Sequence, residues 1–123
     1  MNEYAATAML MNAAAGERIL VIERDGRAVR QAVESFRQPN EAYAFGAQIR
    51  IANGAESVRL PSGGRISFAT PRGYHRMRGQ SVDVVFIDND AHRVLGESID
   101  AYDRFRLDVA LVLKSTNGRV VHS

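Results

Sequence analysis

The chain has 123 residues, which is enough for one domain and too few for two. Apolar residues make up 46% and charged residues 24%, which is ordinary for a globular domain and argues against a disordered, collagen-like or membrane protein. The formal net charge is only +2, and the absence of cysteine excludes disulfides, thiolate zinc sites and cysteine nucleophiles. We therefore expect an intracellular, cytoplasmic protein.

The first third of the chain alternates helix and strand patterns. Residues 2–14 are rich in alanine and predict a helix that ends at Gly16. Their apolar run is too short to cross a bilayer and has no basic segment before it, so we expect neither a membrane span nor a signal peptide. The run at 18–23 predicts a buried strand, and Asp25 is placed to cap an amphipathic helix over 27–37.

The middle of the chain has the pattern of β-hairpins. Short alternating segments at 48–52, 57–61 and 65–70 are separated by Asn53-Gly54 and by the turn 61–64. Three arginines occupy the polar alternate positions of these segments, namely Arg50, Arg59 and Arg65. They are predicted to face away from the apolar positions Ile49, Ile51, Val58, Leu60, Ile66 and Phe68.

The last third begins with the most hydrophobic strand of the chain, residues 82–88, which predicts a central parallel strand with both faces covered. Residues 97–113 have helical spacing, although VALVL at 109–113 is also consistent with a hairpin that pairs with the last strand at 119–123. Strands that alternate with helices predict an α/β fold with a mostly parallel sheet.

Charge is unevenly distributed along the second half. Residues 57–82 contain five arginines and no acid, whereas residues 83–108 contain seven acids and three arginines. The basic block predicts a surface that follows a nucleic-acid backbone, with arginines that fork to phosphates and a tyrosine that stacks on a base. The alternative is a solvated face that the acidic block balances. The residues predicted for this surface are Arg59, Arg65, Arg72, Tyr74, Arg76 and Arg78.

The apolar strand ends abruptly in acids, Asp88-Asn89-Asp90. Ligands of parallel α/β sheets bind beyond the carboxyl ends of the strands, and an Asp there can hold Mg²⁺ beside the phosphates of a nucleotide. The alternative is a strand followed by an Asp that caps a helix. The three histidines are scattered and have no metal-ligand spacing.

A family resemblance is carried by GRISFATPRGYHRMRGQSVDVVFIDNDAH, which resembles the Walker B region of the large terminase subunits of tailed phages. AATAMLMNAAAGERILVIERDGRAVRQAVESF is similar to the family's segment after the phosphate-binding loop, and NGRVVHS to its sensor strand. The resemblance implies one degenerate ATPase-like domain over 1–123, of the RecA-like P-loop NTPase type with a β-hairpin insertion. It also makes Asp88 and Asp90 the remnant of Walker B.

The departures from the family pattern bear on activity. No G-x-x-x-x-G-K-[ST] motif is present, and the one lysine is Lys114, so the family's first strand and phosphate loop are missing. Asn89 stands where the family has its catalytic Glu, and an amide cannot take a proton from water. These departures imply a non-catalytic phage protein that binds DNA or another protein in the host cytoplasm.

Two alternatives remain open. One is an ATPase component of a DNA-packaging motor in which Asp88 holds Mg²⁺ with ATP and a partner chain supplies the phosphate loop. The other is a structural or host-interacting protein. In the fold that the resemblance implies, the missing strand lies between the Walker B and sensor strands, so we expect either direct pairing of those two strands or a homo-oligomer or partner that completes the sheet.

Overall fold

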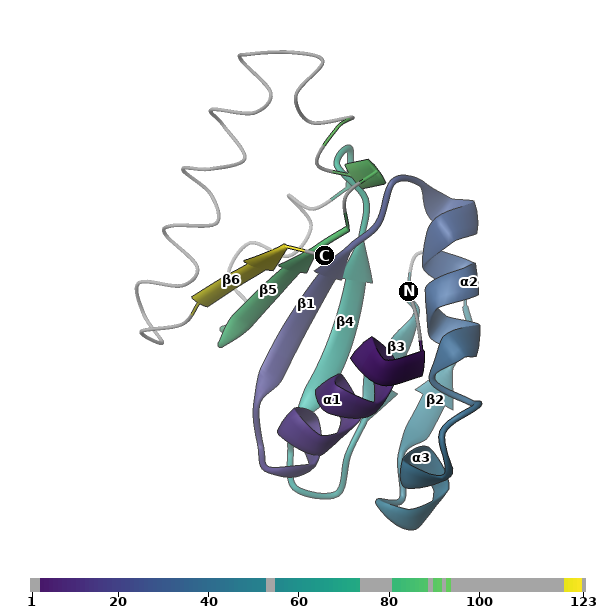
Figure 1. Cartoon of the computed structure of the whole chain (residues 1–123), viewed down its shortest axis with the longest axis vertical. Helices are drawn as coiled ribbons and strands as arrows, with labels where there is room; N and C mark the ends of the chain where they lie inside the picture. The colour runs from purple at the N-terminus through teal and green to yellow at the C-terminus, as the bar shows by residue number, and fades with distance from the viewer. Residues whose placement is uncertain are drawn as a thin grey trace.

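The computed structural model describes residues 3–52, 55–73, 81–88, 90–91, 93 and 119–122. Its centre is a six-stranded sheet with the strand order β2-β3-β4-β1-β5-β6 (Figure 1). The strands are β1 (Arg18–Ile22), β2 (Gln48–Arg50), β3 (Ser57–Arg59), β4 (Arg65–Ala69), β5 (Val84–Ile87) and β6 (Arg119–His122).

The sheet has a parallel core and an antiparallel border. Strand β1 pairs in parallel with β4 on one side and with β5 on the other, and β5 pairs in parallel with β6. Strands β2 and β3 are antiparallel to each other, and β3 is antiparallel to β4. The predicted α/β class, the mostly parallel sheet and the hairpins are therefore confirmed.

The acid-tipped apolar segment is in the interior of the sheet. Its strand β5 lies between β1 and β6 and is parallel to both, as predicted for a central strand. The pairing of β5 with β6 is direct, and no other described strand lies between them.

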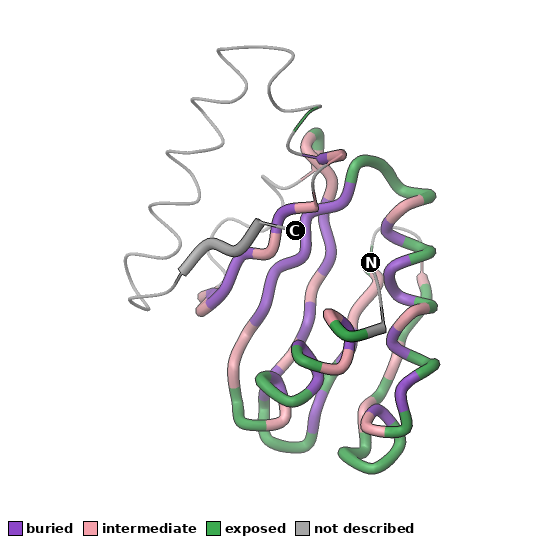
Figure 2. The backbone as a smooth tube through the Cα atoms, viewed as in Figure 1, coloured by how far each residue is buried: buried purple, intermediate pink, exposed green. Residues whose placement is uncertain are grey.

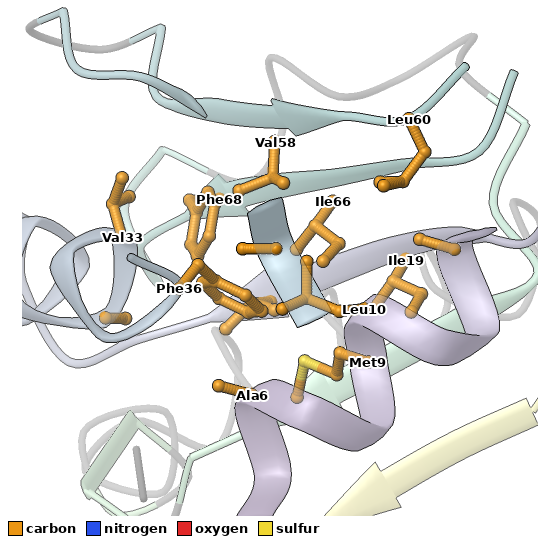
Figure 3. Close-up of a cluster of buried hydrophobic side chains, with 14 of the residues drawn as sticks. Ala6, Met9, Leu10, Ile19, Val33, Phe36, Val58, Leu60, Ile66 and Phe68 are labelled. Atoms are coloured by element: carbon orange, nitrogen blue, oxygen red, sulfur yellow. The ribbon is translucent and has the colours of Figure 1, made fainter. Parts of the chain in front are cut away.

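The three helices of the described part of the chain cover one face of the sheet (Figure 1). They are α1 (Glu3–Ala14), α2 (Gly26–Ser35) and α3 (Asn40–Ala44). Their apolar side chains form one core with alternate residues of the strands, among them Ile19, Val58 and Ile66 (Figure 3). Within it the rings of Phe36 and Phe68 meet edge to face, with centroids 5.8 Å apart.

The opposite face of the central strands is also apolar. Leu20, Ile22, Val85 and Ile87 alternate with the residues that contact the helices, and all are buried. Figure 2 shows buried positions along β1, β4 and β5 and exposed positions on the turns and the outer sides of the helices. Burial on both faces explains why β5 reads as a continuous apolar run.

The structure differs from the predicted elements mainly at their ends. Helix α2 ends at Ser35, and the short helix α3, which the sequence analysis did not predict, begins at Asn40 after Pro39. Strand β2 stops at Arg50, so Ile51 lies beyond the sheet and is exposed, which contradicts its assignment to the apolar face. The helix or hairpin considered for 97–113 lies outside the described residues.

Asp25 caps α2 as predicted. Its backbone is extended, and its carboxylate accepts the backbone N–H of Ala28 at 2.9 Å. This hydrogen bond is the largest cause that lowers the pKa of Asp25 from its ordinary value of 3.8. The cap therefore stabilises the fold above the ordinary pKa of an Asp and is lost as the pH falls through the lowered one.

We expect Asp25→Ala to lower the thermal midpoint at neutral pH by on the order of a few degrees, because it removes the acceptor at the start of α2. Asp25→Asn keeps a side-chain acceptor and is expected to retain most of the stability. Circular dichroism melts of the three proteins test this. Equal losses in both variants would show that the charge, rather than the cap, stabilises the helix.

Candidate functional site

Polar residues follow three neighbouring parallel strands where they end at one edge of the sheet. The backbone N–H of Glu23 donates to Ala69 at 3.0 Å, and that of Asp88 donates to Ile22 at 3.0 Å, so both ladders continue one residue beyond the strands. Glu23 therefore lies between Thr70 and Asp88 across the strands. Lateral neighbours in parallel strands point to the same face, so these side chains form a row, called the carboxyl edge below.

Glu23 is the unusual residue of the carboxyl edge. It is only 3% exposed, and its Oε1 atom is buried without a hydrogen-bond partner among the described residues. Burial, followed by the nearby charges of Asp88 and Asp90, raises the pKa of Glu23 from 4.5 to about 7. Glu23 was not predicted as a site residue, although an acid directly after the apolar run RILVI is the same signal that marked Asp88.

The two predicted acids have different surroundings. Asp88 is partly buried, and its Oδ2 atom accepts the backbone N–H of Asp90 at 3.0 Å. Asp90 is paired instead with two guanidinium groups, with Arg24 at 3.8 Å and with Arg93. Because its charge is already compensated, Asp90 is the less available ligand of the two. The third member of the predicted motif, Asn89, lies outside the described residues.

A second polar surface lies on the sheet face opposite the helices. Arg59 pairs across the strands with Gln48 and with Arg65, and Arg65 pairs with Arg18, so these four residues form one row. Arg50, Ser57 and Ser67 form the next row. We call this surface the basic sheet face, and its residues are Arg18, Gln48, Arg50, Ser57, Arg59, Arg65 and Ser67.

The arginines of the basic sheet face are not all equally available. Arg18 makes hydrogen bonds to both carboxylate oxygens of Asp83, at 3.2 and 3.3 Å. Arg65 is partly buried and donates to the carbonyl of Ser81 at 3.3 Å, which is a neutral acceptor. Arg50 and Arg59 are exposed and have no ion pair or hydrogen bond to another described side chain. For three arginines of this face, Arg50, Arg59 and Arg65, the described part of the chain therefore shows no ion pair, and Asp83 lies beyond Arg18 at the end of their row.

The structure distributes the predicted nucleic-acid residues over different places. Arg59 and Arg65 are cross-strand neighbours. Arg72 is exposed beyond the other end of β4, in the turn that follows the strand. Tyr74, Arg76 and Arg78 lie outside the described residues. Arg18 and Arg50 complete the face. They were not among the predicted nucleic-acid-binding residues, because both lie outside the basic block 57–82 from which those residues were taken.

Comparison with known proteins gives no relative for this chain: no family model, curated protein or solved structure matches it. Among the described residues, no three Asp, Glu or His side chains converge with the geometry of a metal site. The helices of the described part are also too short or too polar to cross a bilayer.

Proposed function

We propose that this chain is a non-catalytic nucleic-acid-binding module that uses the basic sheet face. The observation that carries the proposal is the placement of three arginines that form no ion pair among the described residues, Arg50, Arg59 and Arg65, on a sheet face that no described helix covers. Two of the three are exposed, so their guanidinium groups can reach a ligand without rearrangement of the fold. Each guanidinium can donate two parallel hydrogen bonds to a phosphate.

The chemistry of the face favours the phosphate backbone over the bases. Gln48, Ser57 and Ser67 supply neutral donors beside the arginines, and no aromatic ring lies among the residues of this face. Contacts of this kind depend on charge and position, so binding is expected to be largely independent of base sequence and strongly dependent on salt.

The proposed relation to the terminase ATPases is supported by the parallel core, by the hairpin border and by the interior strand β5 that ends at Asp88. A RecA-like P-loop origin accounts for this combination in a phage protein. Asn89 accounts for the assignment as non-catalytic, because its amide cannot act as a general base.

A second candidate function is favoured by the carboxyl edge. Asp88 stands at the end of a central parallel strand, where a nucleotide-bound Mg²⁺ would lie in an ATPase component. In this candidate a phage partner supplies the phosphate loop. ATP hydrolysis by a mixture of the two chains, abolished by Asp88→Asn, would support it and contradict the non-catalytic assignment.

The test of nucleic-acid binding removes the two exposed arginines. We expect the double variant Arg50→Gln with Arg59→Gln to bind DNA at least about tenfold more weakly and to lower the salt slope by about two, since two phosphate contacts are lost. Fluorescence anisotropy with labelled single-stranded and duplex oligonucleotides at about 50–200 mM salt measures both quantities.

The matched control removes two exposed arginines from the opposite side of the sheet. Arg27→Gln with Arg30→Gln on α2 changes the net charge equally. Affinity within about threefold of the unmodified protein is expected for this control. Equal losses of DNA affinity in both double variants would show that net charge alone explains the loss. Absence of DNA binding by the unmodified protein at low salt would refute the proposal.

A further inference from the structure

The carboxyl edge contains a polar group that the nucleic-acid proposal does not use. Glu23 is 97% buried, and its Oε1 atom has no hydrogen-bond donor among the described residues. A buried acceptor without a donor destabilises a fold, because it has lost its water and gained nothing in return. The Oε1 atom of Glu23 therefore has room for a partner that the described part of the chain does not supply.

Asp88 is the nearest candidate to share such a partner. The strand register makes it the lateral neighbour of Glu23, and the two side chains lie on the same face of the sheet. One oxygen of Asp88 accepts the N–H of Asp90, and Asp88 is only partly buried, so the pair is open to solvent on the Asp88 side.

The nearby guanidinium groups of the described residues form their ion pairs with other carboxylates. Arg24 forms its ion pairs with Asp25, at 3.1 Å, and with Asp90, at 3.8 Å. Arg93 pairs with Asp90. The guanidinium groups of the carboxyl edge are thus directed to the outer carboxylates, while the inner two have none in the described part of the chain.

We propose that Glu23 and Asp88 together bind one divalent cation of the Mg²⁺ or Mn²⁺ class directly, without a nucleotide. Carboxylate oxygens are the ligands that hard divalent cations prefer. Mg²⁺ commonly takes one or two carboxylates and retains water in its other positions, which suits a pair that no third acid joins among the described residues. Such a site is weak, with dissociation in the millimolar range or somewhat below.

The test uses Mn²⁺ as a paramagnetic probe on the full chain in a buffer without nucleotide or nucleic acid. As Mn²⁺ is titrated to about 5 mM, amide signals of residues 22–24 and 87–88 should broaden first, and those of Arg50 and Arg59 should broaden last. Mg²⁺ in excess should reverse the broadening. Broadening that begins elsewhere, or none at all, would overturn the proposal.

Three isosteric variants then separate direct binding from the general negative field. Glu23→Gln and Asp88→Asn should each weaken Mn²⁺ binding at least about tenfold, whereas Asp90→Asn should change it by less than about threefold. Equal effects of all three would show attraction without a defined site and would contradict the proposal. DNA binding by the basic sheet face is measured separately, so either proposal can fail while the other holds.

Discussion

Replacing Gly64 with alanine is expected to lower the free energy of unfolding by about 3 kcal/mol or more. A Cβ atom at this position would lie 1.8 Å from the carbonyl oxygen of Ala13 and 2.7 Å from its carbonyl carbon. Both are backbone atoms, so no side-chain rotation relieves the overlap, and either α1 or the turn before β4 must move.

The turn at Gly64 cannot move without loss of other contacts. Ser62 donates its hydroxyl to the same Ala13 carbonyl at 2.8 Å, and Gly64 donates its N–H to the Ser62 hydroxyl at 3.1 Å. The carbonyl of Gly64 accepts the N–H of Leu60, which closes the β3–β4 hairpin. Displacement of the turn would therefore open the hairpin and expose the end of α1 together.

Urea denaturation followed by circular dichroism measures the effect. Gly26→Ala is the matched control, because the added Cβ meets nothing within 4 Å and the residue does not have positive φ. The control should stay within about 0.5 kcal/mol of the unmodified protein. A Gly64→Ala protein as stable as this control would contradict the close packing of α1 on the hairpin.

Replacing Glu23 with glutamine is expected to stabilise the protein at pH 8 and to change little at pH 4. The pKa of Glu23 is raised from 4.5 to about 7, mainly by burial, so the folded state retains a proton that the unfolded state has released. In the unmodified protein, the stability that depends on protonated Glu23 is fully present below pH 4.5. It is lost as the pH rises through about 7. A tenfold change in protonation is about 1.4 kcal/mol, so the rise of the pKa from 4.5 to about 7 corresponds to roughly 3–4 kcal/mol in full.

The measurement is the free energy of unfolding of both proteins between pH 4 and pH 9, with a chelator present to exclude divalent cations. Glu34→Gln on the exposed surface of α2 provides the control for loss of one carboxylate. Its stability difference should be small at every pH. A difference between Glu23→Gln and the unmodified protein that does not grow from pH 4 to pH 8 would contradict the buried, protonated state of Glu23.

The carboxyl edge and the basic sheet face place opposite charges in different parts of one small sheet. Arginines gather near the start of β4, whereas Glu23 and Asp88 lie beyond the ends of β1 and β5. A bound phosphate backbone is thus attracted to one region and repelled from the other unless a cation occupies the carboxyl edge. Comparing the DNA affinity with and without Mg²⁺ shows whether a cation at the carboxyl edge removes this repulsion.

Local patterns in the sequence were sufficient to predict most of the helices and strands. Helix α1 and its end near Gly16, the cap at Asp25 and the apolar strand before Asp88 were all predicted, because each depends on residues close together in the chain. The alternation of Arg59 and Arg65 with Val58 and Ile66 was also predicted, since the period of two is a property of the strand itself.

Only the tertiary structure decided which residues became neighbours across the sheet. Arg18 and Asp83 are 65 residues apart and still form a hydrogen-bonded ion pair, because β1 is inserted between β4 and β5. The same insertion buries Glu23 beside Asp88 and adds Arg18 to the arginines of the hairpin. A sequence pattern specifies which side of a strand a residue occupies, but strand order and register arise from the packing of the whole core. The lateral partners on which both proposals depend therefore could not be predicted from the sequence pattern.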